Sequence, residues 1–123
     1  MMSLRILRAI AEVEVCKLID RGHGLVDRLA QVGSINSCED FRGVLKDHVD
    51  WSEEVLSRLS NFFEGGDELI AQWKALQVGG VHEGKSLRED IKGLTHSADG
   101  GIKWLRRLHD RLKDLPQSPR TPT

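Results

Sequence analysis

The residues best suited to catalysis gather around His48. Asp47 and Asp50 flank this histidine, and Ser52 follows it one helical turn later. A histidine that bonds a hydroxyl can act as a general base. Residues one or two positions apart on a helix do not face each other, so neither aspartate can orient the imidazole ring. We therefore predict that His48 is a core residue bonded to a hydroxyl on another helix, and that the chain has no catalytic site.

The two cysteines, Cys16 and Cys38, could form a disulfide or supply a nucleophile. In an antiparallel pair of helices their positions leave them about 18 Å apart along the axis, whereas a disulfide needs Cα atoms within about 7 Å. A helix dipole favours a thiolate at its N-terminus, but Glu39 and Asp40 beside Cys38 oppose that effect. We expect two free thiols, as is usual in a reducing compartment.

Five histidines make a metal site the next candidate. His109 and Asp114 are separated by four residues, and His23 and His48 fall on two earlier predicted helices. This spacing is similar to that of the last helix in the hemerythrin-like family of di-iron bundles, and the resemblance implies an iron site between helices. The family's pattern also needs a carboxylate after His48, where this chain has Ser52, and an H-x-x-x-H pair, which this chain lacks.

Other metal and cofactor patterns are also missing. No two His or Cys residues are spaced four apart on one helix face, as a zinc site in a helical frame needs. His82 and Glu83 are adjacent and do not converge easily on one ion. The glycine pairs at 79–80 and 100–101 lack the spacing of a phosphate-binding loop. We predict no metal and no cofactor.

Length and composition fit a single soluble domain. A chain of 123 residues can bury a core without disulfides or metal ions. The net charge of −1 gives no reason to expect nucleic acid or an anionic membrane as a partner, and three Trp with no Tyr offer few rings for base stacking. No segment has the length of a membrane span, and the N-terminus lacks a signal peptide's unbroken apolar run. We expect a cytoplasmic protein.

Apolar residues at helical spacing predict an all-α fold, an antiparallel bundle of three long helices and one short helix. The expected helices cover residues 3–32, 37–64, 67–76 and 86–115. Residues 1–115 then form one domain, and the Pro-rich segment 116–123 forms a disordered tail.

Glycines and caps set these bounds. Gly33 and the pair at 65–66 end the first and second helices, and a loop covers 78–85. Ser86 and Glu89 match the capping-box pattern at the start of the last helix, and Pro116 ends that helix. Gly22 and its neighbour at position 24 predict a kink or a close helix contact in the first helix.

The last helix carries the most regular pattern in the chain. Its apolar residues recur in steps of four and three, which puts them on one stripe: Leu87, Ile91, Leu94, Ala98, Gly101, Leu105, Leu108, Leu112 and Leu115. The stripe keeps its phase across the glycines at positions 93, 100 and 101, so we predict one continuous helix.

Charge separates the second helix from the last. Residues 37–64 include seven acidic and three basic side chains, whereas residues 85–115 include eight basic and five acidic ones. One interpretation is that these helices are neighbours whose charges pair across the bundle rim. The other is an interaction surface for an anion or an acidic partner, with an aromatic anchor beside a basic row. Its candidate residues are Lys103, Trp104, Arg106, Arg107 and Arg111.

These observations favour a non-enzymatic interaction, adaptor or regulatory domain. Its partner is another protein or a second copy, because apolar residues beside the main stripes leave a strip to bury between protomers. These flanking residues are Ile6, Ile10, Val13 and Trp51. Binding of nucleic acid or an anionic ligand through the basic row stays as the alternative.

Overall fold

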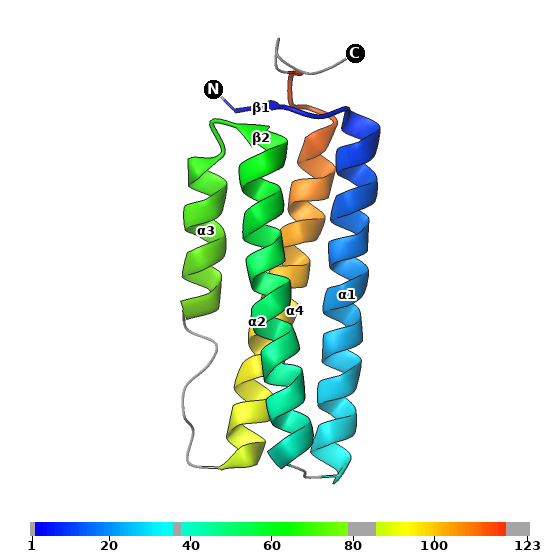
Figure 1. Cartoon of the computed structure of the whole chain (residues 1–123), viewed down its shortest axis with the longest axis vertical. Helices are drawn as coiled ribbons and strands as arrows, with labels where there is room; N and C mark the ends of the chain where they lie inside the picture. The colour runs from blue at the N-terminus through cyan, green and yellow to red at the C-terminus, as the bar shows by residue number, and fades with distance from the viewer. Residues whose placement is uncertain (1, 36–37, 79–85, 118–123) are drawn as a thin grey trace.

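The computed structural model describes residues 2–35, 38–78 and 86–117 (Figure 1). Three long helices and one short helix account for nearly all of them, which confirms the all-α bundle. They are α1 (Arg8–Ile35), α2 (Cys38–Phe62), α3 (Asp67–Val78) and α4 (Leu87–Leu112). Two short strands, β1 (Ser3–Leu4) and β2 (Phe63–Glu64), pair antiparallel at one end of the bundle.

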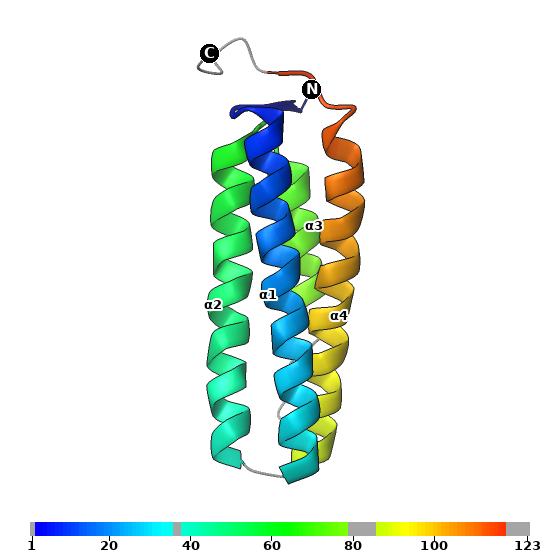
Figure 2. The same ribbon diagram turned by 90° about the vertical axis from the view of Figure 1, so that its right-hand side faces the viewer.

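Successive helices run in opposite directions and occupy the corners of a square (Figures 1 and 2). Both α1 and α3 pack against α2 and α4, so α1 and α3 lie at opposite corners. The short helix α3 covers only the half of the bundle nearest the strands (Figure 1). This arrangement decides which residues of α2 and α4 are covered.

The first predicted helix is wrong at both ends. It begins at Arg8 rather than Ser3, because Leu4 is buried and bonded on two sides. Leu4 pairs with Phe63 in β2, and its amide donates to the carbonyl of Pro116 at 2.9 Å. The helix also continues past Gly33 to Ile35, since a glycine costs a helix only about 1 kcal/mol.

The second helix ends earlier than predicted. Phe63, which lies within the predicted helix 37–64, belongs to β2 and is buried there. Gly65 then adopts a φ of 73°, a left-handed conformation that glycine reaches at no steric cost. This turn leads directly into α3, whose predicted start at Asp67 is confirmed.

The predictions for α4 are confirmed at its start and along its stripe. The Ser86 side chain accepts a hydrogen bond from the amide of Glu89 at 3.2 Å. The helix is continuous across its three glycines, and six of the nine stripe residues are fully buried. These are Leu94, Ala98, Gly101, Leu105, Leu108 and Leu112.

The end of α4 is held by the N-terminal segment. Arg8 donates through Nε to the carbonyl of Leu112 at 2.9 Å, one of the carbonyls that a helix end leaves without a partner. Pro116 and Gln117, the first two residues of the expected tail, also contact this segment: the Gln117 side chain donates to the carbonyl of Ile6. The remainder of that tail lies outside the described residues.

Three tryptophans from three helices meet in the core. Trp73 of α3 lies between Trp51 of α2 and Trp104 of α4, with ring centroids 5.3 and 5.4 Å away. Each indole N–H has an acceptor, which a buried tryptophan needs. Trp51 donates to the carbonyl of Leu18 at 2.8 Å, and Trp73 donates to the hydroxyl of Ser52 at 3.0 Å.

Two helical glycines make room for these rings. A Cβ on Gly101 would lie 2.8 Å from Trp73 and 2.9 Å from Trp51, and one on Gly22 would lie 2.8 Å from Trp51. Helix α1 is unbroken at Gly22, so the close-contact alternative holds there. By contrast, a Cβ on Gly24 or Gly100 would meet nothing within 4 Å.

None of the helices in residues 2–35, 38–78 and 86–117 combines the length and hydropathy that crossing a membrane requires.

Candidate interaction site

The basic row of α4 lies on the surface, and its members differ in their contacts. Lys103 pairs with Asp99 at 3.2 Å, and a guanidinium nitrogen of Arg106 lies 2.9 Å from Nε2 of His23 on α1. Arg107 and Arg111 are exposed and take part in none of the ion pairs among the described residues. These two arginines therefore carry positive charge that the described fold leaves unpaired.

Trp104 is not the exposed anchor considered from the sequence. Only 7% of it is exposed, and its Nε1 donates to Oε1 of Gln72 on α3 at 3.1 Å. The helical stripe alone placed Trp104 at its margin, but α3 packs over that margin and buries the ring. The basic row therefore has no exposed aromatic residue next to it.

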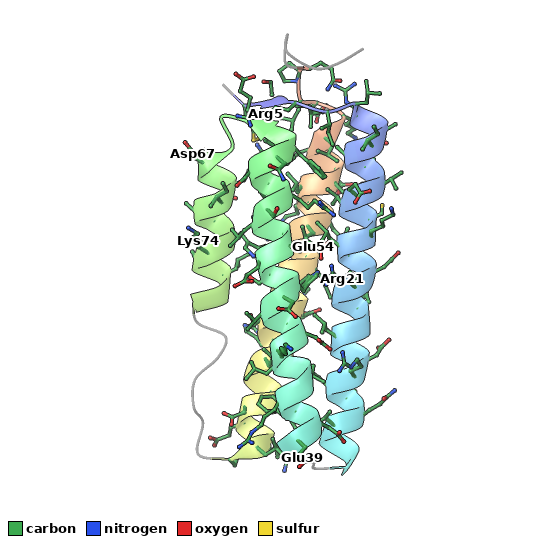
Figure 3. The ribbon with its side chains drawn as sticks, in the orientation of Figure 1. Arg5, Arg21, Glu39, Glu54, Asp67 and Lys74 are labelled. Atoms are coloured by element: carbon green, nitrogen blue, oxygen red, sulfur yellow. The ribbon has the colours of Figure 1, made fainter. Side chains whose placement is uncertain are left out.

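Two acidic residues of α2 pair with bases of α1. Ion pairs join Arg21 to Glu54 and Arg28 to Asp47, and Figure 3 shows the side chains of the first pair on neighbouring helices. None of the described ion pairs joins α2 to α4, because these helices occupy opposite corners of the bundle. The expectation that acidic α2 and basic α4 pair across the rim is wrong for the described residues.

A small cleft lies between α3 and α4, beneath the two unpaired arginines. Its volume is about 210 Å³, and its lining is mostly apolar. The lining residues are Leu69, Gln72, Trp104, Arg107, Leu108 and Arg111. The α3 residues that line this cleft were not predicted from the sequence. The only signal for them there is that Leu69 and Gln72 are three positions apart, and so lie on one face of α3.

A row of apolar side chains is exposed at the start of α1. Leu7, Ile10 and Val13 are 48%, 49% and 54% exposed. Ile10 and Val13 were expected in such a strip. The other two expected members are not: Ile6 is half-buried, and Trp51 is fully buried in the tryptophan cluster.

The residues around His48 do not assemble into a catalytic group. His48 is buried as predicted, and burial lowers the pKa of its imidazole from 6.5 because charge is costly away from water. Its Nε2 has no hydrogen-bond partner within the described part of the chain, so the expected bond to a hydroxyl is not made at that atom. The Ser52 hydroxyl is bonded to Trp73 instead, and Asp47 pairs with Arg28.

The histidines are not brought together either. Across the three described ranges, no group of three His, Cys, Asp or Glu side chains could hold a metal ion. His23 is exposed beside Arg106, whereas His48 is buried against Trp51 at 5.7 Å between ring centroids. The ligand set that the hemerythrin-like resemblance implies is therefore not assembled by these residues. His82 and Glu83 lie outside them.

Cys16 is exposed and is not part of a disulfide. This agrees with the prediction that the two cysteines lie too far apart to bond. The side chain of Cys38 lies outside the described residues.

No protein-family model matches this chain, and neither a curated protein nor a solved structure matches it. Any function must therefore be argued from these surfaces themselves.

Proposed function

We propose that this chain is a non-enzymatic protein-interaction domain, of the adaptor or regulatory kind, that forms a homodimer through α1. The observation that carries the proposal is the exposed row of Leu7, Ile10 and Val13. Single apolar residues on a surface are ordinary, but a contiguous row is a feature of contact surfaces. Burying apolar area contributes about 25 cal/mol per Å², so covering the row stabilises a complex.

A second copy suits this row for two reasons. A two-fold axis lets one surface patch serve both partners, which is the commonest way that soluble proteins associate. Glu14 and Lys17, which pair with each other at 3.3 Å within the chain, also place both signs of charge on the same half of α1, so two antiparallel α1 helices would not set only like charges against each other. The proposal includes a reducing, cytoplasmic setting, which the free and exposed thiol of Cys16 supports.

Light scattering over a dilution series tests the proposal, with a matched pair of variants. Val13→Glu places a charge in the row, whereas Val49→Glu places one at a similarly exposed valine on α2 (46% exposed). We expect the wild-type chain and Val49→Glu to have the mass of two chains, and Val13→Glu to have the mass of one. A wild-type monomer at every concentration, or equal effects of the two variants, would overturn the homodimer.

A second candidate function, binding of nucleic acid or another anionic ligand, is favoured by the unpaired charges of Arg107 and Arg111. Its test is a fluorescence-anisotropy titration with a single-stranded oligonucleotide at several salt concentrations. Binding through phosphates weakens steeply with salt and weakens further when these arginines are replaced. The buried ring of Trp104 and the net charge of −1 count against it.

A further inference from the structure

The cleft between α3 and α4 combines an apolar interior with charge at its edge. The buried side chains of Leu69 and Leu108 lie beneath it on the two helices, and the exposed side chains of Arg107 and Arg111 complete its wall. The polar atoms at its floor are already bonded. Trp104 donates to Oε1 of Gln72, whose amide nitrogen donates to Glu68 at 3.4 Å. The base of the cleft is therefore apolar, and the exposed arginines at its edge offer the unsatisfied donors.

The size of the cleft limits what it can hold. About 210 Å³ is smaller than the roughly 300–1,000 Å³ of typical small-molecule sites. It suits one large apolar side chain rather than a cofactor. Arginine guanidinium groups bond carboxylates with two parallel N–H donors, so the groups next to that side chain should be carboxylates.

Protein is a better occupant than nucleic acid. Nucleic acids are bound through phosphate charge and through exposed rings that stack on bases, and the Trp104 ring is covered by α3. An acidic residue, Asp110, also lies among the bases of α4, and Asp114 follows just after the end of the helix. Two arginines above an apolar hollow match an apolar side chain set between acids better than they match a continuous phosphate backbone.

We propose that the α3–α4 cleft is a docking site for an acidic segment of a protein partner, which inserts one apolar side chain between α3 and α4 while its carboxylates bind Arg107 and Arg111. This rests on the proposed function only in treating the chain as a protein-interaction domain. It does not depend on the homodimer, because none of the residues that line the cleft lies on α1, which carries the proposed dimer contact.

The test follows the three indole N–H signals of the full chain by NMR while a peptide is added. The probe is acetyl-Glu-Glu-Leu-Phe-Glu-Asp amide, and Trp104→Phe assigns the Trp104 signal. We expect a saturable shift of that signal with a Kd below about 1 mM. The Trp51 signal should not move, because its N–H is bonded to the Leu18 carbonyl in the core. An unmoved Trp104 signal overturns the proposal.

Two charge-reversal variants separate the cleft from general electrostatics. Arg107→Glu with Arg111→Glu should weaken binding at least about tenfold. Arg88→Glu with Lys92→Glu makes the same change of charge on exposed residues of α4 outside the cleft and should change Kd by less than about twofold. Equal weakening by both double variants contradicts a specific site. Thermal unfolding of each variant checks that the fold is retained.

Modified probes test each half of the proposed chemistry. A peptide with Ala-Ala in place of Leu-Phe, and one with Gln and Asn in place of the acids, should each bind at least about tenfold more weakly. An oligonucleotide that shifts Trp104 when the peptide does not overturns the protein partner and favours the anionic-ligand alternative. The mass of the wild-type chain is measured separately, so loss of the homodimer and loss of the cleft site are distinguishable.

Discussion

The tryptophan cluster and the site of His48 lie one helical turn apart on α2, in the same core. At the cluster, Trp51, Trp73 and Trp104 each have an acceptor for the indole N–H, supplied by the backbone of α1 or by side chains of α2 and α3. At the next turn, the Nε2 of His48 is buried and has no partner within the described residues.

The indole N–H groups stabilise the core through hydrogen bonds, whereas the buried Nε2 of His48 makes no such contribution. A bonded N–H costs little to bury, whereas an unbonded polar atom loses its contact with water and costs about 1–3 kcal/mol. The cluster therefore fixes how three helices meet. His48 offers the bundle ring contact with Trp51 but no hydrogen bond at Nε2.

Replacing the central ring of the cluster should have the largest effect on stability. Trp73→Ala removes contacts to two tryptophans and is expected to lower the free energy of unfolding by about 3–5 kcal/mol. His48→Leu fills a similar place without an unbonded nitrogen and should change it by less than about 1.5 kcal/mol. Urea unfolding followed by circular dichroism measures both. If Trp73→Ala does not fold, Trp73→Phe provides the comparison. Similar losses at the two sites would mean that the distinction between them is wrong.

Two adjacent glycines sharpen the comparison by probing the packing around the cluster. Gly101→Ala forces a methyl group against the rings of Trp73 and Trp51 and should cost about 1–3 kcal/mol. Gly100→Ala, one residue earlier, meets no atom within 4 Å and should stabilise the helix by about 0.5–1 kcal/mol. The midpoint temperature of thermal unfolding should therefore fall in Gly101→Ala and rise in Gly100→Ala. A shift in the same direction would contradict close packing at Gly101 alone.

The pH dependence of stability tests the His48 side of the comparison. Burial lowers the pKa of folded His48 below 6.5, so as the pH falls below 6.5 the unfolded chain takes up a proton that the folded chain does not. Stability from this residue is complete above pH 6.5 and is lost as the pH falls toward the lowered folded pKa, by at most about 1.4 kcal/mol per pH unit. The difference in urea midpoint between about pH 7.5 and about pH 5.5 should be smaller in His48→Leu than in wild type. An equal difference would show that His48 does not titrate in this way.

Surface charges should have the smallest effects. Both members of the Arg28–Asp47 pair are about half exposed, so Arg28→Ala should change the free energy of unfolding by less than about 1 kcal/mol. The double change of Arg107 and Arg111 to Glu should lie within about 1 kcal/mol of wild type for the same reason. Urea unfolding checks both. A larger loss of unfolding free energy in the double variant would mean that the two arginines stabilise the packing of α3 instead of being free to bind a partner.

Much of the fold could be predicted from local pattern. The steps of four and three along α4 identified its buried stripe, and Ser86 identified its start. Spacing also separated Cys16 from a disulfide and placed His48 in the core. These predictions succeed because helical periodicity and capping depend on residues only three or four positions apart.

The candidate site could be predicted only in part. Arg107 and Arg111 were identified as exposed bases, but the same pattern placed Trp104 at the margin of the stripe, where it would be only half covered. The ring is buried because α3 returns along α4, and nothing within α4 indicates on which side a short helix from another part of the chain will pack. The strand at Ser3–Leu4 was missed for a similar reason, since its partners are Phe63 and Pro116.

The sequence by itself determined that this protein is a helical bundle, which side of α4 faces the core, and where α3 and α4 begin. Those properties follow from short-range spacing. Only the tertiary structure decided which helices are neighbours, and therefore that α1 takes the ion pairs of α2. It also decided that Gly22 and Gly101 make room for Trp51, and that a cleft lies beneath Arg107 and Arg111. These depend on residues far apart in the chain, whose contacts are set by how whole helices pack.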